Sequence, residues 1–338
     1  MQNILWKIRF GFHIAKYFTF RKIVNLSSLA LSYSLSIFKI EYHKKSLPFF
    51  LSVEVSNFCN LHCPECPVGI RKISKVDAKT VDANVYQKLI DELKPTLQHL
   101  ILYFQGEPLL NKQLPELINY AHRANIFTST STNAQFLTKD NAKLLVLSGL
   151  DKLIISIDGS TQETYEKYRI GGRLDKAIDG IKHIVFWKNE LKSLTPMVEI
   201  QFLVLKTNEH QMDEMRRLAK SLKANRMSFK TAQLYDFENG NALMTSKKRY
   251  SRYKKNHDGK YVMKGKQPNR CLRLWSGGVV NAHGEVLPCC FDKESNYSFG
   301  NVSKSGYSAC RHNEKASGFR ESILQNRKQF EICRNCTG

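Results

Sequence analysis

The strongest constraint on the fold is a regular alternation of strand-type and helical segments that begins near residue 49. Six short β-type runs are expected as strands, at 51–56, 99–104, 126–131, 152–157, 198–205 and 226–232. Helical patterns lie between them, at 82–94, 112–124, 139–148, 161–168 with 174–190, and 209–223. Strands spaced by helices of this length predict parallel βαβ units. Six units are too few to close an eight-fold barrel, so we predict an α/β fold with a partial (β/α)6 TIM-like barrel over residues 49–235. Its functional loops should lie at the C-terminal strand ends.

A cysteine loop follows the first predicted strand. In "FCNLHCPECP", Cys59, Cys63 and Cys66 have C-x3-C-x2-C spacing. Soft thiolates select zinc, copper or iron–sulfur clusters, and iron–sulfur clusters are normally held by four cysteines. Zinc-finger ligands come instead as two separated pairs. Three thiolates can hold a 4Fe–4S cube while one iron stays open for another ligand.

The nine cysteines of the chain are an odd number and fall in tight clusters. No compact apolar segment followed by a small-residue cleavage site is visible in the first 40 residues. These features indicate metal ligands in a reducing cytoplasm, not a disulfide scaffold.

A C-x3-C-x2-C loop after the first strand of a partial barrel resembles the signature of the radical S-adenosylmethionine (radical SAM) enzymes. The resemblance implies that the open iron chelates the amino and carboxylate groups of S-adenosylmethionine. Reductive cleavage of this cofactor would give a 5′-deoxyadenosyl radical that abstracts a substrate hydrogen. It also implies an electron donor of the flavodoxin or ferredoxin type.

Two further stretches match this family in the expected order. "FQGEP" (104–108) resembles its Gly-Gly-Glu-Pro motif, which implies cofactor binding by Gly106 and Glu107, although Gln105 stands where the first glycine is usual. "STSTNA" (129–134) resembles its Thr-Asn-Gly and implies that Thr132 and Asn133 lie close to the cofactor. Alanine replaces the glycine there. Each stretch alone would also fit a plain turn.

Three later segments extend the match. In "ISIDG" (155–159), Ser156 and Asp158 are expected on one face of the fourth strand, where the family contacts the ribose and methionine. Arg169 in "YEKYRIGG" is a candidate partner for the methionine carboxylate, because guanidinium binds carboxylate bidentately. Gln201 on the fifth strand is expected near the adenosine. No general base can be assigned, and Tyr103 and Glu199 are candidates only by their inward strand positions.

The C-terminal part, residues 271–338, resembles the auxiliary-cluster extension called SPASM in its longer form and twitch in its shorter one. Gly284 is expected near the turn of its β-hairpin, which a helix should follow. Four well-spaced cysteines would hold one fully ligated auxiliary 4Fe–4S cluster: Cys271, Cys289, Cys333 and Cys336. Cys290 and Cys310 are expected to be structural.

The chain carries a net charge of +22, from 52 Lys and Arg against 30 Asp and Glu, which favours anionic partners without choosing among them. Residues 1–48 hold eight basic residues and one acid, Glu41. Apolar residues such as Ile4, Ile8 and Phe12 recur there at roughly helical spacing. The run 24–38 is too short and too polar for a confident transmembrane span. Two interpretations stay open: a basic amphipathic helix on an anionic membrane, involving residues 1–45, or a helix packed on the protein's own body.

Residues 236–270 are basic and tyrosine-rich without an apolar period, which indicates a linker or long loop. Tyr250, Tyr253 and Tyr261 among basic residues could stack on nucleic acid. We favour a solvated connection and expect no nucleic-acid partner.

Taken together, these patterns predict a cytoplasmic radical SAM oxidoreductase, with attachment to the inner face of the membrane left open. Family members with one auxiliary cluster include alcohol-to-ketone dehydrogenases, so oxidation of a small-molecule, sugar or lipid-linked substrate is favoured. The first 48 residues are too few for a winged-helix peptide-recognition domain, so a peptide-modifying maturase is the alternative. Two alternatives from other classes are a zinc-containing nucleic-acid-binding protein and an electron carrier with two clusters.

Overall fold

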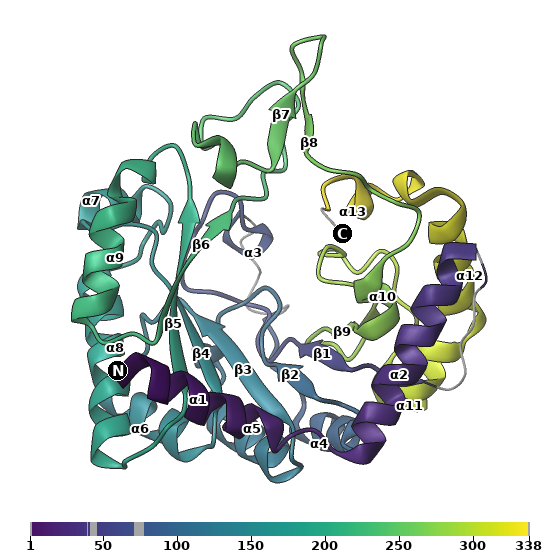
Figure 1. Cartoon of the computed structure of the whole chain (residues 1–338), viewed down its shortest axis with the longest axis horizontal. Coiled ribbons are helices and arrows are strands. Elements are labelled where there is room, and N and C mark those ends of the chain that lie inside the picture. Colours follow the sequence, from purple (N-terminus) through teal and green to yellow (C-terminus); the bar gives the residue numbers. More distant parts are fainter. Residues whose placement is uncertain (1, 39, 41–45, 71–77, 337–338) are drawn as a thin grey trace.

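Figure 1 shows the computed structural model, which describes residues 2–38, 40, 46–70 and 78–336. Six parallel strands form its centre, in the order β1-β2-β3-β4-β5-β6. Their bounds are β1 Phe50–Val53, β2 His99–Ile101, β3 Phe127–Thr132, β4 Lys152–Ser156, β5 Met197–Val204 and β6 Arg226–Thr231. The predicted partial (β/α)6 barrel is confirmed. Because all six strands run the same way, their C-terminal ends meet at one edge.

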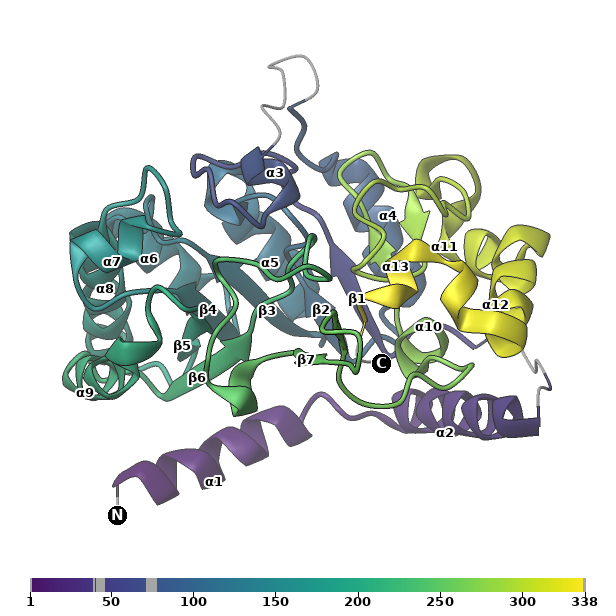
Figure 2. The ribbon, with the colours of Figure 1, turned by 90° about the horizontal axis from the view of Figure 1, so that it is seen from above.

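Helices connect these strands and cover the outer face of the sheet (Figure 2). Their bounds are α4 Ala83–Leu93, α5 Leu114–Arg123, α6 Lys139–Leu147, α7 Gln162–Glu166, α8 Leu174–Glu190 and α9 Met212–Ser221. Several begin at a capping side chain, as where Asp82 accepts a hydrogen bond from Val85 N and Thr138 accepts one from Asn141 N. One apolar core joins the helices to the strands; β1, β3, β4 and β5 are mostly buried, whereas the edge strand β6 is largely exposed or half-buried.

The C-terminal region extends this sheet. Strand β9 (Val279–Val280) pairs in parallel with β1, and β10 (Val286–Leu287) pairs antiparallel with β9. Gly284 lies in the turn between them at φ +83°, a conformation that favours glycine. The helices of this region are α10 Leu272–Ser276, α11 Val302–His312, α12 Glu314–Asn326 and α13 Glu331–Arg334. The predicted hairpin is therefore present and is fused to the barrel through β1.

The segment 236–270 is more ordered than the expected loop. Strands β7 (Tyr253–Lys255) and β8 (Tyr261–Met263) form a small antiparallel hairpin. Tyr253 is buried, stacks on Phe237 with ring centroids 4.4 Å apart, and donates from its hydroxyl to Oδ1 of Asn335. Its ring is therefore not available to stack on a base, because the apolar cluster beneath the hairpin holds it.

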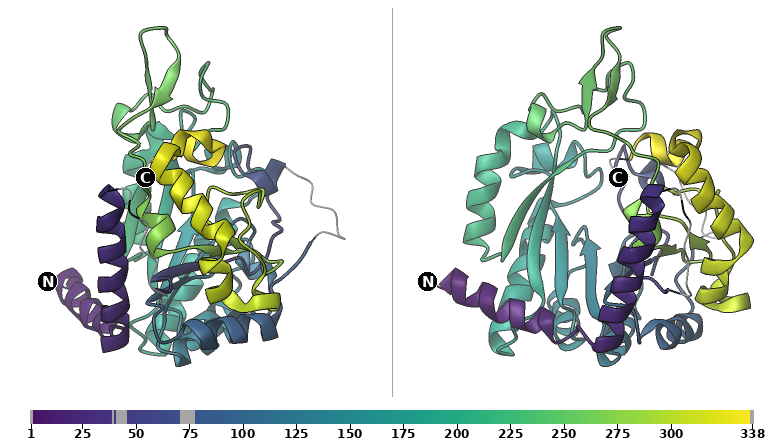
Figure 3. Two further views of the ribbon diagram at one scale, coloured as in Figure 1. Left: turned by 90° about the vertical axis from the view of Figure 1, so that its right-hand side faces the viewer. Right: turned by 45° about the vertical axis from the view of Figure 1, so that its right-hand side comes forward.

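The N-terminal segment forms two helices, α1 (Gln2–Ala15) and α2 (Phe20–Leu35), on one side of the molecule (Figure 3). Phe10 and Tyr17 pack on Phe127 and Met197, at the starts of β3 and β5. Part of this segment thus lies against the protein's own body. Among the residues that the structure describes, no helix is long and apolar enough to cross a membrane. The basic residues Lys39, Lys44 and Lys45, and Glu41, lie outside the described residues.

Candidate functional site

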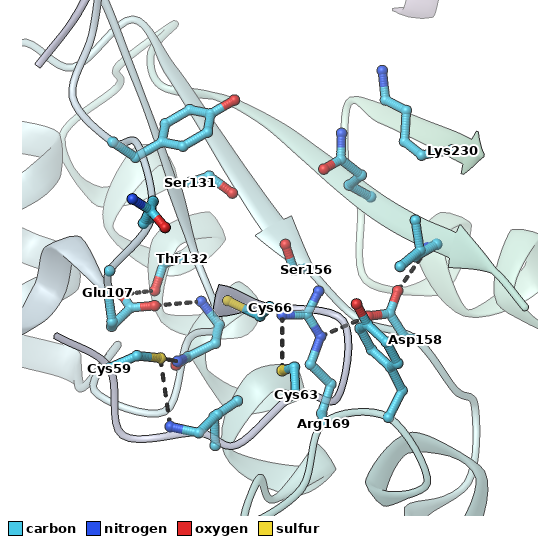
Figure 4. Close-up of a pocket in the computed structure, with 18 residues that line it drawn as sticks. Cys59, Cys63, Cys66, Glu107, Ser131, Thr132, Ser156, Asp158, Arg169 and Lys230 are labelled. Carbon is cyan, nitrogen blue, oxygen red and sulfur yellow. Dashed lines mark hydrogen bonds and ion pairs between the residues drawn. The ribbon is translucent and has the colours of Figure 1, made fainter. Parts of the chain in front are cut away.

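A pocket opens at the edge where β1–β6 end (Figure 4). The cysteine loop after β1, which leads into the short helix α3 (Pro67–Ile70), forms one wall, and residues from β2–β6 and their loops form the rest. All three loop cysteines and all eight predicted cofactor contacts line it: Cys59, Cys63, Cys66, Gly106, Glu107, Thr132, Asn133, Ser156, Asp158, Arg169 and Gln201. Residues as distant in sequence as Cys59 and Gln201 therefore meet at one place.

The loop thiols are largely enclosed. Leu61 N and Asn133 Nδ2 donate to Sγ of Cys59, at 3.4 and 3.6 Å. Burial raises the pKa of Cys59 to about 12 and also raises that of Cys63. In the described part of the chain, the thiols are not gathered closely enough to share one ion. Cysteines of a 4Fe–4S cube each bind a different iron, so this arrangement is compatible with a cube, whose irons would hold the thiols as thiolates.

Gly106 is required by the close approach of the cysteine loop. A Cβ at this position would lie 2.2 Å from the carbonyl oxygen of Ser56 and 2.7 Å from that of Phe58. The next residue, Glu107, donates its backbone N–H to Phe58 O at 2.8 Å. The end of β2 thus supports the backbone of the cysteine loop directly.

The Glu107 carboxylate ties the end of β2 to the end of β3. It accepts hydrogen bonds from Thr132 Oγ1 at 2.6 Å, Asn133 N at 2.8 Å and Leu109 N at 3.1 Å. Burial raises its pKa, which these three donors oppose. Ala134 follows at φ +60°, the left-handed conformation in which glycine is usual. The alanine that departs from the family's Thr-Asn-Gly therefore keeps the backbone shape that a glycine would favour.

Asp158 and Arg169 form a buried ion pair at the floor of the pocket. Arg169 Nε donates to Asp158 Oδ2 at 2.6 Å, while Leu203 N donates to Oδ1. Arg169 Nη1 lies 4.0 Å from Sγ of Cys63. Both oxygens of Asp158 thus have protein partners, and the ion pair fixes the position of Arg169 in the pocket lining.

The pocket lining also includes Tyr103, which follows β2, Gln201 within β5 and Lys230 on β6. Glu199, a candidate base, does not line the pocket. It lies two residues before Gln201 on β5 and is ion-paired with Lys152 Nζ at 2.6 Å. Burial alone would raise the pKa of Glu199, but this lysine holds it below the usual value. The ion pair explains why an inward position on the strand does not make Glu199 available for catalysis.

A second group of thiols lies in the C-terminal region. Cys271 caps α10, Cys289 follows β10, and Cys333 and Cys336 lie at α13. Burial raises the pKa of Cys289, and the nearby Cys271 and Cys333 thiols add to the rise. Cys336 in turn lies close enough to raise the pKa of Cys271. The four predicted ligands are therefore neighbours in space.

Arg327 is buried beside these thiols. Its charge lowers the pKa of Cys271 and Cys333, against the effect of burial. An arginine in this position would offset part of the negative charge of a cluster bound there.

The two remaining cysteines have different surroundings, and Cys290, next to Cys289 in sequence, also raises the pKa of that thiol. Cys290 packs against Phe104 and has Arg273 Nη1 at 3.3 Å from its Sγ. Cys310 is buried in α11, with Ser305 Oγ at 3.3 Å.

Short-range contacts join the barrel to the C-terminal region beside the pocket. Gln105 Nε2 donates to Lys293 O at 2.9 Å, and Glu54 Oε2 accepts from Ala282 N at 3.1 Å. Burial raises the pKa of Glu54 to about 7. The pairing of β1 with β9 and these contacts therefore fix the position of the C-terminal cysteines relative to the cysteine loop.

Comparison with known proteins decides the family. The pattern of the radical SAM superfamily matches residues 53–219, and that of an iron–sulfur cluster-binding domain, SPASM, matches residues 271–337. The chain belongs to the radical SAM superfamily. It is an enzyme of this class with a C-terminal SPASM domain. This assignment argues against the alternative of a zinc-containing nucleic-acid-binding protein.

Two curated relatives have low sequence identity to this chain but match most of its length. The tungsten-containing aldehyde ferredoxin oxidoreductase cofactor-modifying protein of Pyrococcus furiosus is 22% identical over 316 residues, which cover 85% of this chain and 87% of that protein. The PqqA peptide cyclase of Gluconobacter oxydans is 28% identical over 264 residues, 72% of this chain and 70% of the cyclase.

Solved structures share the fold. Streptococcus suis SuiB bound to S-adenosylmethionine superposes with a TM-score of 0.64 at 17% identity, covering 87% of this chain and 73% of SuiB. BtrN in complex with AdoMet and 2-DOIA superposes with a TM-score of 0.52 at 18% identity, covering 86% of this chain and 94% of BtrN.

Within this radical SAM architecture, the sequence reasoning missed three residues that the structure brings to the sites. Lys230 lies on the last predicted strand, but nothing in "RMSFKTA" distinguishes it from a solvent-facing lysine. Arg327 meets the C-terminal thiols, and Glu54 meets Ala282 of the C-terminal region, only through the tertiary fold. A buried charge is not visible in a local pattern, so no sequence signal could have found these two.

Proposed function

We propose that the chain holds a 4Fe–4S cluster on Cys59, Cys63 and Cys66 and uses it to oxidise a substrate. When bound, this cluster and S-adenosylmethionine, given one electron, supply a 5′-deoxyadenosyl radical that abstracts a hydrogen atom from the substrate. The convergence of the three thiols with all eight predicted cofactor contacts in one pocket carries the proposal. A flavodoxin- or ferredoxin-type protein would supply the electron.

The chain's own residues would bind and orient S-adenosylmethionine. Arg169, held by Asp158, presents a guanidinium that suits the methionine carboxylate. Gly106 and Glu107 bring backbone and carboxylate oxygens to the cofactor's amino group, next to Thr132 and Asn133. Ser156 and Gln201, register partners on β4 and β5, lie side by side where the ribose and adenine would be expected.

We further propose one auxiliary 4Fe–4S cluster, on Cys271, Cys289, Cys333 and Cys336. Four neighbouring thiols complete the ligation of one cube. The Cys290 thiol lies beside Arg273, and the Cys310 thiol lies beside Ser305. These two thiols do not provide the four ligands that a second auxiliary cluster would need.

The favoured reaction is dehydrogenation of a small-molecule, sugar or lipid-linked substrate by a cytoplasmic enzyme. Tyr103 and Lys230 give the pocket lining a hydrogen-bonding hydroxyl and a cation. Such a lining suits a polar or anionic substrate group. The relationship to PqqA peptide cyclase supports the alternative of a peptide substrate.

Metal analysis of anaerobically reconstituted protein tests the cluster assignment. One open and one auxiliary cluster predict about eight irons per chain, because each cube holds four. The Cys59→Ala/Cys63→Ala/Cys66→Ala variant should retain about half, with Cys310→Ala as an unchanged control. About twelve irons in the wild type would refute the single auxiliary cluster. Comparison of metabolites, lipids and peptides from cells with wild-type or triple-variant enzyme would then identify the substrate class.

A further inference from the structure

Helix α2 is amphipathic, but its polar side faces the protein and its apolar side faces outward. The face against the protein buries Lys22, Asn25 and Ser32, with Leu29 as its apolar member. The outward face carries exposed Phe20, Ile23, Val24 and Leu31. Helices at a protein–water boundary normally bury the apolar stripe and expose the polar one.

The inward polar residues have specific partners that fix the orientation of α2. Lys22 Nζ donates to Asn125 O at 2.5 Å. Asn25 Nδ2 donates to Leu47 O at 2.9 Å, and Leu47 N donates back to Asn25 Oδ1 at 3.1 Å. A rotation of α2 that buried its apolar side would break these hydrogen bonds, so they hold the apolar side outward.

Helix α1 adds to the same surface. Tyr17 donates from its hydroxyl to Asp151 at 2.6 Å, and His13 Nε2 lies 2.5 Å from the same carboxylate. These contacts, together with buried Phe10, turn Ile8 and Phe12 outward, and Phe12 is 75% exposed. Figures 2 and 3 show both helices along one side of the molecule.

The outer face of α1 and α2 concentrates the exposed apolar side chains of the molecule. Of the twenty exposed large apolar residues in the described part of the chain, eleven lie within the first 40 positions. These eleven define the α1–α2 face: Ile8, Phe12, Phe18, Phe20, Ile23, Val24, Leu26, Leu31, Ile37, Phe38 and Ile40. Soluble monomers rarely expose an apolar patch of this kind unless it binds something.

Charge indicates what covers the α1–α2 face. Residues 1–40 contain six Lys and Arg and no Asp or Glu. Exposed Lys7 and Arg9 flank Ile8, and exposed Lys16 and Arg21 lie near Phe18 and its neighbours. Basic side chains around an apolar helix face match an anionic lipid surface, where the apolar groups enter the acyl boundary and the cations meet the headgroups. A second copy of the chain would instead bring two cationic surfaces together.

We infer that the α1–α2 face docks the enzyme on an anionic lipid bilayer, with the outer sides of both helices in the interface. This inference rests on the surface and not on the proposed reaction. Under this inference both interpretations of the N-terminal segment hold: the inner side of each helix packs on the protein, and the outer side binds lipid.

Vesicle flotation of reconstituted full-length protein tests the inference. The wild type should float with phosphatidylglycerol/phosphatidylcholine vesicles and much less with phosphatidylcholine alone. The Phe12→Ser/Phe20→Ser/Leu31→Ser variant should lose at least about tenfold in binding, since each substitution removes an exposed apolar side chain that would enter the lipid. The matched control replaces exposed apolar residues on α6 and α8, Leu144→Ser/Leu147→Ser/Phe186→Ser, and should bind as the wild type does.

A charge variant provides a second, independent readout. Lys7→Gln/Arg9→Gln/Lys16→Gln should weaken binding to anionic vesicles and make the remainder insensitive to salt. Circular dichroism and iron content establish that each variant is folded. The inference is overturned if the wild type does not float with anionic vesicles, or if the folded triple-serine variant floats as the wild type does. It is also overturned if the serine substitutions abolish self-association but leave vesicle binding unchanged.

Discussion

Arg169 and Asp158 are joined by an ion pair of 2.6 Å beneath the cofactor pocket, with the carboxylate completely buried. The second carboxylate oxygen accepts a hydrogen bond from the backbone N–H of Leu203, so each oxygen of Asp158 has a protein partner. The pair links the loop after β4 to the segment between α7 and α8, and it holds the guanidinium near the thiol of Cys63.

Asp158→Asn should destabilise the protein by about 3 kcal/mol, because it leaves the Arg169 charge in a largely buried site without its counter-ion. It should also weaken S-adenosylmethionine binding. The matched control is Asp175→Asn, which breaks an exposed pair with Arg173 and should cost less than about 1 kcal/mol. Denaturant unfolding and calorimetric titration measure the two effects. Equal losses in both variants would show that burial of the pair contributes nothing.

Gly106→Ala should displace the cysteine loop, since its Cβ would overlap the carbonyl oxygen of Ser56. We expect about half of the iron to be lost, corresponding to one cube of two. Gly318→Ala, on α12 with open space around the glycine, serves as the control and should keep all of it. A full iron content in Gly106→Ala would contradict the close approach of the loop to β2.

Glu54 should make the protein less stable as pH rises. Burial raises its pKa to about 7 in the folded state, so between its unfolded value near 4.5 and about 7 the native protein binds the additional proton. Stability is therefore greatest below this window and falls through it. Oε1 of Glu54 has no hydrogen-bond partner among the described residues, which adds to the cost of ionising it.

Glu54→Gln should flatten this dependence and stabilise the protein at pH 8 by up to about 3 kcal/mol, because one pKa unit corresponds to about 1.4 kcal/mol. Thermal unfolding of both proteins from pH 5 to 8 provides the measurement. Parallel curves for wild type and variant would assign the pH dependence to other groups.

Arg327→Gln should lower the reduction potential of the auxiliary cluster. The reduced cluster carries one more negative charge, and a buried arginine beside three of its cysteines stabilises that charge. Potentiometric titration followed by electron paramagnetic resonance measures the shift. Lys328→Gln removes the neighbouring exposed cation and should leave the potential nearly unchanged. The account of Arg327 fails if both variants behave alike.

The sequence was sufficient for those features that depend on local patterns. The alternation of strand and helix predicted β1–β6 to within a few residues, because buried parallel strands form short apolar runs. The pocket residues were found because the motifs that hold them resemble those of the radical SAM family, and most of these motifs lie at or near the C-terminal ends of parallel strands, which meet at one edge. Features created by long-range packing were not found. Tyr253 falls in a basic stretch without period, yet the apolar cluster beneath the hairpin buries it, and nothing near Arg327 in sequence reveals the thiols around it.

The orientation of α1 and α2 also could not be predicted from the sequence. Their apolar and basic composition was visible, but which side faces the protein depends on Asn25 meeting Leu47 and on Tyr17 meeting Asp151. Neither partner can be recognised before the fold is known.

The most direct test of the central claim is formation of 5′-deoxyadenosine by the reconstituted protein with S-adenosylmethionine and dithionite. We predict that the wild type and the Cys290→Ala control form it, and that the Cys59→Ala/Cys63→Ala/Cys66→Ala variant forms none. Absence of 5′-deoxyadenosine from wild-type protein with its full iron content, or equal formation by the triple variant, would contradict the account.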